Sequence, residues 1–389
     1  MSDNNITRIY PERGQKKTWP RVLAAVLAVI AVVAIVVVIL LRGGVSLDGV
    51  RRYVRYLGVS RSETDGRFTF DQHSSNAYSA AGDGLAVASV GGVSVYDQNG
   101  DELYTVARSL STPAAQSGGS VTLAYDIGGT ALVAVDHSRG VTADVTTGGA
   151  LLDADISSGG AIAYCAVEDG KKTVLTVLDT KQQEIYKWYS SSSFLSPCAV
   201  SARGGQAAAI AAGQSEHTYE STLELFDTSS QDDPATVSLG NLLVYDLDYL
   251  ADDALCAVGD TEAVFAGTDA SLAGRYDYGG RYLKDYSLGG DGFLALALNT
   301  YQAGSRYSVV TVDADSLGAK ELYLGVEVLS VSAAGPYLAV LTVDGLNIYT
   351  QDLTLYAQET DTGSATHVLQ RSDGTALLVS GNSASLFIP

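Results

Sequence analysis

The sequence predicts an all-β fold, a β-propeller of eight blades preceded by a single transmembrane helix, with seven blades as the alternative count. Three observations predict this fold: a long apolar run, a sharp change of charge after it, and a turn-and-strand unit repeated along the remaining chain. The expected domains are a cytoplasmic tail at 1–21, the transmembrane helix at 22–41, a basic amphipathic helix with linker at 42–65, and the propeller at 66–389.

The apolar run VLAAVLAVIAVVAIVVVILL occupies residues 22–41 and contains neither a charged residue nor a proline. Twenty residues that each rise 1.5 Å span about 30 Å, which is the hydrocarbon thickness of a bilayer. A cleaved signal peptide has a shorter apolar core and a small-residue cleavage site, and this run has neither. We therefore expect a membrane anchor, with the lipid bilayer as one partner.

Charge divides the chain after the apolar run. Residues 1–61 hold ten Lys and Arg against three Asp and Glu, whereas residues 62–389 carry a net charge of −27. Nucleic-acid binding needs a positive surface, so the acidic part of the chain is excluded from that class. Five basic residues lie on each side of the span, but Lys16, Lys17 and Arg21 flank it closely. These charges favour a single-pass protein with a cytoplasmic N-terminus and an extracytoplasmic propeller in the cell envelope.

The stretch SLDGVRRYVRYLG at 46–58 follows the span and has the apolar spacing of one helical stripe. Arg51, Arg52 and Arg55 fall on another face of that helix. Such a helix suits the lipid headgroup layer, where arginines meet phosphates, so these three are the candidate membrane-surface residues. An equally open alternative is that the stripe packs on the propeller and the arginines are solvated.

Beyond residue 66, short apolar strands alternate with turns rich in Gly, Asp, Asn and Ser, which is the pattern of an all-β domain. One unit, a turn followed by a strand of small apolar residues, recurs eight times, and its starts lie about 30 to 47 residues apart. This spacing matches a four-stranded propeller blade. The eight occurrences are GDGLAVASV (82–90), GGTALVAVD (128–136), GGAIAYCAV (159–167), GGQAAAIAA (204–212), ADDALCAVG (251–259), GGDGFLALAL (289–298), AGPYLAVLT (334–342) and SDGTALLVS (372–380).

The two ends of the repeat predict how the ring closes. The last unit supplies only three strands, so GRFTFDQ at 66–72 is expected to pair with it near residues 384–388 and complete the blade. Ring closure removes exposed strand edges. The units near residues 131 and 161 lie only about 30 residues apart. This leaves open whether the second blade lacks a strand or whether the count is seven.

Turns such as YDQNGDELY at 96–104 and LDTKQQEIYKW at 178–188 resemble β-propeller repeats of the pyrroloquinoline quinone-like type, found in quinoproteins. Such repeats end hairpins in Asp-x-x-x-Gly followed by a strand with Trp, and here only Trp188 can dock in a blade. No cofactor is therefore expected. The whole chain resembles a family of membrane-anchored bacterial propellers of unknown function, largely from Gram-positive species. The tail, the span, 46–58, AYDIGGTALVAV at 124–135 and RYDYGGRYL at 275–283 carry this resemblance, which implies a fold and an envelope location.

Cysteines and histidines form no recognisable site. The three cysteines fall in separate repeats without CxxC spacing, so we expect them to be buried in apolar packing: Cys165, Cys198 and Cys256. The four histidines lack the spacing of metal ligands: His73, His137, His217 and His367. No metal site is assigned to them.

Two acidic stretches resemble fragments of a calcium loop: YDLDYLADD, with Asp246, Asp248, Asp252 and Asp253, and VDADSLG, with Asp313 and Asp315. Neither has the further ligands and closing Glu at the required spacing, so we assign these carboxylates to hairpin turns. No nucleophile elbow or phosphate-binding loop is present either. No catalytic residue is assigned.

Two functions from different classes follow. The first is a non-catalytic binding or scaffold module of the bacterial cell envelope that engages a protein or a cell-wall polymer. The alternative is an envelope hydrolase or redox enzyme with its site at the central channel, which a cluster of inward-facing carboxylates would favour. Since no catalytic motif is recognisable, the binding module is the preferred function.

Two loops that join second and third strands look long, GQSEHTYES at 213–221 and NTYQAGSRY at 299–307. Such loops share one propeller face with the connections between blades, and functional residues concentrate on loops held by a rigid scaffold. Tyr and Arg supply much of the energy at interfaces. The alternative is that both are variable solvent loops. The candidate partner-binding residues are His217, Tyr219, Tyr301, Arg306 and Tyr307.

Overall fold

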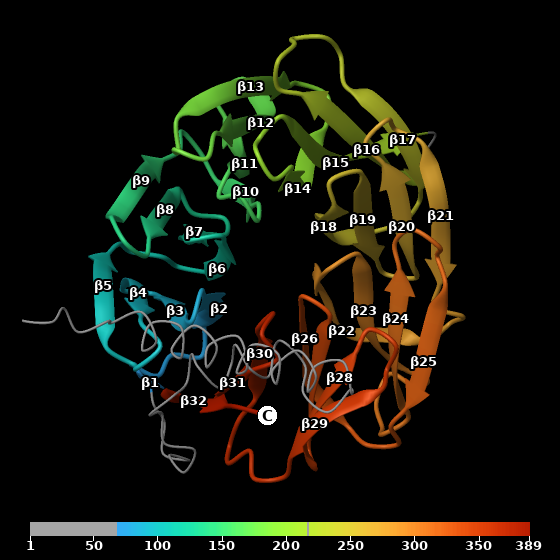
Figure 1. Cartoon of the computed structure of the whole chain (residues 1–389). Helices are drawn as coiled ribbons and strands as arrows, with labels where there is room; N and C mark the ends of the chain where they lie inside the picture. The colour runs from blue at the N-terminus through green and yellow to red at the C-terminus, as the bar shows by residue number, and fades with distance from the viewer. Residues whose placement is uncertain (1–67, 216–217) are drawn as a thin grey trace, which may run out of the picture. The chain divides into compact units, whose positions relative to one another are not determined.

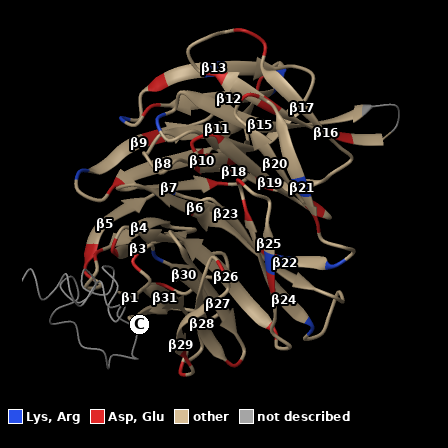
Figure 2. Ribbon diagram, turned by 45° about the vertical axis from the view of Figure 1, so that its right-hand side comes forward, with Lys and Arg blue, Asp and Glu red and all other residues tan. Residues whose placement is uncertain are grey.

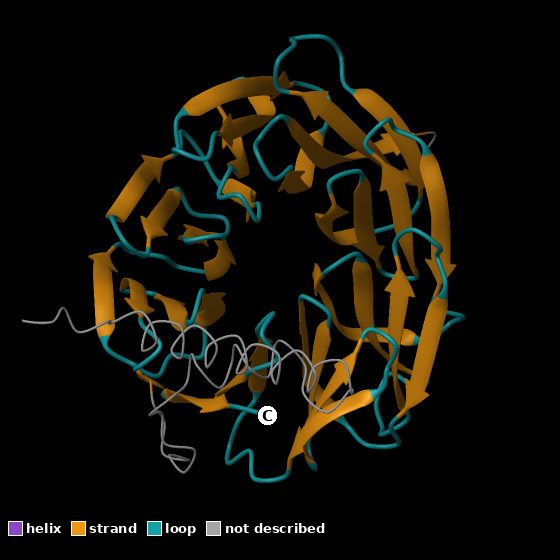
Figure 3. Cartoon of the chain, viewed as in Figure 1, coloured by secondary structure: helices purple, strands orange, loops and turns teal. Residues whose placement is uncertain are grey.

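The computed structural model describes residues 68–215 and 218–389, which form eight four-stranded antiparallel sheets. These blades are arranged radially around a central channel (Figure 1). All regular elements of the described residues are strands (Figure 3). None of these residues forms a helix with the length and hydropathy of a membrane span. The predicted all-β propeller and its eight blades are confirmed, while the predictions for the tail, the span and Arg51, Arg52 and Arg55 lie outside the described residues.

Each blade contributes one strand to each of four concentric positions. The first strands, which surround the channel, are β2 (Ala77–Ala81), β6 (Pro113–Gly118), β10 (Leu151–Ile156), β14 (Phe194–Val200), β18 (Val244–Ala251), β22 (Tyr282–Gly290), β26 (Val328–Ala334) and β30 (His367–Gln370). The second strands are β3 (Gly84–Ser89), β7 (Val121–Asp126), β11 (Ile162–Glu168), β15 (Gln206–Ser215), β19 (Ala254–Gly259), β23 (Phe293–Asn299), β27 (Tyr337–Thr342) and β31 (Ala376–Val379). The third strands are β4 (Gly92–Tyr96), β8 (Ala131–Asp136), β12 (Lys171–Leu178), β16 (Thr218–Asp227), β20 (Glu262–Gly267), β24 (Tyr307–Asp313), β28 (Gly345–Thr350) and β32 (Ser383–Phe387). The fourth, outermost strands are β5 (Glu102–Ala107), β9 (Gly140–Thr146), β13 (Glu184–Ser190), β17 (Ala235–Gly240), β21 (Leu272–Asp277), β25 (Ala319–Tyr323), β29 (Leu355–Glu359) and β1 (Phe68–Thr69).

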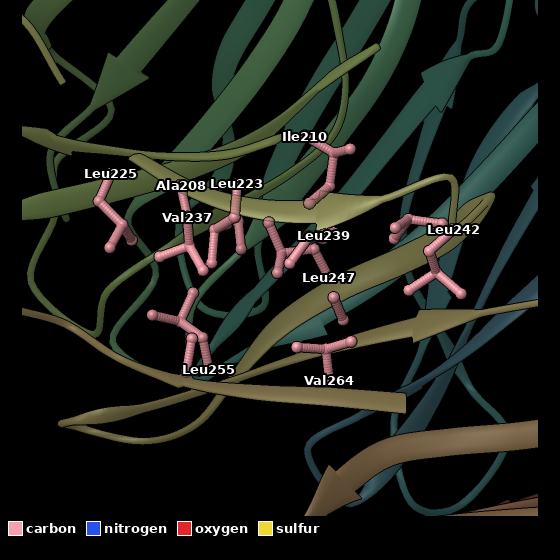
Figure 4. Close-up of a cluster of buried hydrophobic side chains, with 14 residues drawn as sticks. Ala208, Ile210, Leu223, Leu225, Val237, Leu239, Leu242, Leu247, Leu255 and Val264 are labelled. Atoms are coloured by element: carbon pink, nitrogen blue, oxygen red, sulfur yellow. The ribbon is translucent and has the colours of Figure 1, made fainter. Parts of the chain in front are cut away.

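The hydrophobic core lies between neighbouring blades. Figure 4 shows one such layer, in which Ala208 and Leu223 of the fourth blade face Leu255 and Val264 of the fifth. The second strands and most third strands are covered by sheets on both sides, which explains why they are largely apolar rather than alternating. The third strand β16, TYESTLELFD, still alternates. Small residues such as Ala208 allow the sheets to approach closely near the channel.

The second blade corrects one detail of the repeat. ALVAVD at 131–136 was expected to be the second strand of its blade, but it is the third strand, β8. VTLAYD at 121–126 forms the second strand, β7, and this blade has four strands like the others. Both strands are fully buried, so their apolar pattern does not distinguish the two positions. The second repeated unit was thus aligned one strand too late, which explains the short spacing between the second and third units. The alternative count of seven blades is wrong.

The predicted ring closure is confirmed. β1 pairs with β32 of the last blade, with Phe68 opposite Ala384 and Thr69 opposite Ser383. The N–H of Phe70 also donates to the carbonyl of Asn382 at 3.0 Å. The fourth strand of the last blade thus comes from the start of the propeller.

The antiparallel strand order places the loops on two opposite faces. The connection face carries the connections between blades and the turns between second and third strands. The turn face carries the turns between first and second strands and between third and fourth strands. Because β1 is a fourth strand and β32 a third strand, the chain enters the propeller and leaves it on the turn face.

Candidate functional site

Carboxylates on the turn face hold hairpin turns. Asp97 Oδ1 accepts hydrogen bonds from the N–H groups of Asn99 (2.8 Å) and Asp101 (3.0 Å). Asp313 Oδ1 likewise accepts from the N–H of Ser316 at 2.8 Å, and this bond lowers the pKa of Asp313. The turn role predicted for Asp313 is therefore confirmed. Among the described residues, no group of three or more His, Cys, Asp or Glu side chains is placed to hold a metal ion.

Asp246 and Asp248 were assigned to a hairpin turn, and that assignment is wrong. Both lie within β18, a first strand beside the channel. On the first strand of the third blade, β10, Asp153 and Asp155 repeat the same alternate spacing. Side chains two residues apart on a strand point to the same side. The fold thus brings two Asp-x-Asp pairs to the wall of the channel.

The β10 carboxylates satisfy the open edge of the next first strand. Asp153 Oδ2 accepts from the N–H of Cys198 at 2.8 Å, and Asp155 Oδ2 accepts from the N–H of Val200 at 2.9 Å. Asp285 on β22 does the same for the next blade, at 2.6 Å from the donor nitrogen. Such N–H groups would otherwise lie buried without an acceptor. These carboxylates therefore join adjacent blades.

Asp246 and Asp248 bind the main chain differently. Each Oδ1 accepts from the N–H of the following residue in β18, Leu247 at 2.8 Å and Tyr249 at 2.7 Å. Burial raises the pKa of both carboxyls to about 7, and for Asp246 the charges of Asp153 and Asp248 contribute further. The two Asp-x-Asp pairs, on the third and fifth blades, thus repel each other. Asp246 also accepts a side-chain hydrogen bond from Tyr286 of β22 in the next blade, whereas Asp248 makes no such bond within the described residues.

A cavity of about 330 Å³ opens where the first strands of the second to sixth blades reach the turn face. Its polar lining includes Asp248, Tyr249, Asp252 and Asp291, together with serine hydroxyls from the first two of these blades. The hydroxyl of Tyr249 is buried and makes no hydrogen bond. Burial, followed by the charges of Asp155 and Asp248, raises the pKa of Tyr249. The inward-facing carboxylates named above as a mark of an enzyme are therefore present at one channel mouth.

The connection face carries most of the predicted partner-binding residues. Tyr219 is 39 % exposed and Tyr301 is 52 % exposed. The guanidinium of Arg306 lies 5.6 Å from the centre of the Tyr301 ring, a cation–π contact that orders both side chains. Tyr307 was expected to be exposed, but only 6 % of it is accessible because it packs between the sixth and seventh blades. His217 lies outside the described residues.

The β15–β16 hairpin extends past its own blade, as Figure 2 shows. Its residues pair with each other as far as Ser215 and Thr218, whereas β14 stops pairing at Ala212 and β17 at Ser221. The projecting part carries Tyr219. Of the two loops predicted to be long, this one is therefore a β-hairpin arm on the connection face.

Exposed large apolar side chains gather on the same face, which the sequence did not reveal. Of the seventeen that the described residues expose, twelve lie on second-to-third turns, on blade connections or at the adjoining strand ends: Val90, Ile127, Tyr189, Phe194, Tyr219, Leu243, Tyr245, Tyr282, Tyr301, Tyr323, Leu329 and Val343. The other five lie at the start of outermost strands, the ends that adjoin the turn face: Leu103, Val141, Ile185, Leu272 and Leu355. None of the seventeen lies in a turn of the turn face.

Two lysines stabilise part of this apolar surface. Lys171 lies 5.9 Å from the ring centre of Tyr189, and Lys172 lies 5.5 Å from that of Phe194. Lys172 also donates to the carbonyl oxygen of Ser192 at 2.7 Å. We call the twelve side chains listed above, with these lysines and Arg306, the aromatic patch.

Other residue predictions can be checked directly. All three cysteines are buried and free, as expected. Trp188 of β13 packs on Phe226 of the next blade, with ring centres 5.7 Å apart, so it docks between blades as the quinone-type repeats imply. The carboxylates of the first strands were missed. Their signal in the sequence is an Asp-x-Asp or Asp-x-Ser alternation a few residues before three of the repeated units, at 153–155, 246–248 and 285–287.

Solved structures share this fold at low sequence identity. The C-terminal WD40 domain of Sif2 matches with a TM-score of 0.58 and 12% identity, over 84% of this chain and 98% of that chain. Sqt1 of Chaetomium thermophilum, bound to the N-terminus of ribosomal protein L10, matches with a TM-score of 0.55 and 12% identity, over 84% and 100% of the two chains. BamB from Moraxella catarrhalis matches with a TM-score of 0.49 and 12% identity, over 82% and 98%.

The similarities to Sif2 and Sqt1 establish the propeller fold alone. No curated protein matches the chain significantly. The family described as a family of unknown function, DUF5711, matches residues 53–275, which is more than half of the sequence. The chain is therefore a member of the DUF5711 family.

Proposed function

We propose that the chain is a non-catalytic binding or scaffold module that engages a protein through the aromatic patch of its connection face. The uneven distribution of exposed large apolar side chains carries this proposal: among the described residues, twelve lie on or beside the connection face and five lie at strand ends that adjoin the turn face. Contiguous exposed apolar surface on a soluble domain is typical of interaction sites. Tyrosine and arginine are enriched among the residues that supply binding energy.

The architecture supports this use of the face. Tyr301 and Arg306 are held together before any partner arrives, which lowers the entropy lost on binding. The first described strand, β1, begins on the turn face, opposite the aromatic patch. Sqt1, a propeller of the same fold, is bound to a protein segment in its crystal structure.

Photo-cross-linking on intact cells tests the proposal. A photoreactive phenylalanine replaces Tyr219 or Tyr301 on the aromatic patch, and as controls Asp101 or Asp315, which are exposed on the turn face. We expect a discrete cross-linked protein from the patch positions only. Cross-links of equal yield from the control positions, or from no position, would reject the assignment of the face.

Once that protein is identified, a triple variant measures the contribution of the patch. Alanine at Tyr219, Tyr301 and Arg306 should weaken binding at least about tenfold, roughly 1.4 kcal/mol. Tyr307 is left intact because its substitution would damage the core. The variant with Asp101→Asn and Asp315→Asn should bind like the parent. Unchanged affinity in a folded triple variant places binding elsewhere.

We further propose that residues 22–41 anchor the protein in a cell membrane with the propeller outside. The support is the length of the uncharged apolar run and the basic residues Lys16, Lys17 and Arg21 beside it. Protease added to spheroplasts should then remove the propeller, while a cytosolic marker protein stays intact. A propeller that is protected until lysis would show that the orientation is wrong.

A hydrolase acting at the channel is the second candidate function. Asp248 favours it, because a carboxyl in a cavity with its pKa raised to about 7 can give and take a proton near neutral pH. Chromogenic glycoside, ester and phosphate substrates provide the assay. Turnover that Asp248→Asn abolishes without unfolding the protein would favour this function over the binding module.

A further inference from the structure

We propose that the cavity at the turn-face mouth of the channel binds a compact organic cation bearing ammonium or guanidinium groups. This site is distinct from the aromatic patch, which lies on the opposite face. First strands from five blades surround the cavity, so its walls are held by the ring rather than by a single loop (Figure 1). Its volume of about 330 Å³ is in the range of small-molecule sites.

The lining has the composition of a cation site. Asp248, Asp252 and Asp291 reach it from the fifth and sixth blades, and none of the lining residues is Lys or Arg. Serine hydroxyls at Ser157 and Ser158 add neutral acceptors on the facing wall. An ammonium or guanidinium group donates several hydrogen bonds and accepts none, so it complements a wall made of acceptors.

Two further features indicate groups available to a ligand. Tyr249 is a lining residue of the cavity, and its hydroxyl is buried and makes no hydrogen bond within the described residues. A buried polar group without a partner is uncommon in folded proteins and calls for an explanation such as a bound ligand. Asp248 occupies the position that Asp155 has on β10, but it does not hold the neighbouring first strand as Asp155 does. Its second carboxylate oxygen is therefore free to accept from a ligand.

The lining, which includes the aromatic residue Tyr249, favours organic cations over metal ions. A ring face attracts ammonium and guanidinium groups, and the lining residues do not form a cluster of carboxylates close enough for a metal. The cation could be a free small molecule or a Lys or Arg side chain of a protein. Both sources have the same chemistry, so the experiment includes one probe for each.

Titration calorimetry on the purified full chain measures binding of two probes, spermidine and an Arg-Gly-Arg peptide, at matched ionic strength. We expect saturable binding of at least one probe, and the tighter probe identifies the source. Asp248→Asn with Asp291→Asn should weaken it tenfold or more. The matched control with Asp101→Asn and Asp315→Asn makes the same two substitutions at exposed positions on the same face and should change affinity less than twofold. Equal losses in both variants would indicate charge screening and overturn the proposal.

Tyr249→Phe gives a test that does not depend on charge. The variant removes a hydroxyl that lacks a partner, so its melting temperature should equal or exceed that of the parent. Its affinity for the better probe should fall about fivefold or more. Unchanged affinity in this variant, absence of saturable binding by either probe, or equal binding of magnesium chloride would each overturn the proposal.

Discussion

Ring closure makes the propeller depend on one aromatic side chain far from its partners in sequence. Phe68 on β1 is completely buried between the first and last blades, where it packs edge-on against Tyr96 with ring centres 6.3 Å apart. The same cluster includes Leu85 of the first blade and Leu377 of the last. β1 has only two residues, so this side chain is its main apolar contribution to the closure.

The variant Phe68→Ala removes this contribution while leaving the main chain able to pair. Truncation of a buried phenylalanine costs about 3–5 kcal/mol. A large domain loses roughly 2–4 °C of melting temperature per kcal/mol, so we expect a fall on the order of 10 °C. The exposed neighbour Thr69→Ala serves as the matched control, with an expected change below about 0.5 kcal/mol.

Circular dichroism during heating and urea unfolding of the purified full chain measure both variants. Deletion of residues 66–72 should go further, because it leaves strand edges unpaired and should promote aggregation. If Phe68→Ala melts within 2 °C of the parent, as Thr69→Ala is expected to, the closing strand does not hold the ring together.

Three other predictions follow from the channel and the turns. Asp246→Asn should stabilise the protein at pH 8 by about 1–2 kcal/mol and flatten the pH dependence of its stability. The Asp246 carboxyl has a pKa of about 7 in the folded protein against 3.8 in the unfolded chain. The wild type therefore loses stability as the pH rises from about 4 to 7. The full pKa shift corresponds to about 4 kcal/mol. We reduce this figure because the Asp246 side chain is only partly buried and interacts with other carboxyls. Equal urea midpoints of variant and parent at both pH 5.5 and pH 8 would contradict the predicted stabilisation. Asp153→Ala should lower the free energy of unfolding by about 2–4 kcal/mol, because the N–H of Cys198 loses its acceptor. Asp153→Asn keeps an acceptor and should cost less. Equal losses for the two variants in chemical denaturation would disprove the role of Asp153 in joining adjacent blades. Gly92→Ala should destabilise the first blade by more than about 2 kcal/mol, since the added methyl would lie 2.0 Å from a main-chain carbonyl oxygen. Gly128 has open space around it, so Gly128→Ala should cost only about 1 kcal/mol. Thermal melting that ranks the two variants the other way would refute the steric argument.

Local residue chemistry was sufficient to predict the propeller. Small apolar strands between Gly and Asp turns recur at the spacing of one blade, and those properties depend only on neighbours in sequence. The ring closure by GRFTFDQ followed because the last unit lacked one strand. The turn role of Asp313 followed as well, because a carboxylate that binds main-chain N–H groups two to four residues ahead needs no distant partner.

Tertiary structure decided the features that depend on contacts between blades. Two neighbouring strands of the second blade are equally apolar, so only their pairing showed which is second and which is third. Tyr307 resembles its exposed neighbour Tyr301 in sequence, yet one packs against the next blade and the other faces solvent. Asp246 and Asp248 resembled turn residues until the fold placed them on a first strand beside the channel, within electrostatic reach of the Asp-x-Asp pair of β10.

The sequence by itself thus determined the repeat, the all-β class and the closing strand, because period and turn chemistry are local properties of the chain. The radial arrangement of the blades decided which side chains meet across the channel and which share a face. Tyr189, Tyr245 and Tyr301 are scattered over more than a hundred residues, and they gather on one face only because every blade presents the same end of its strands there. The cavity at the other face likewise exists only because five distant segments converge on one axis.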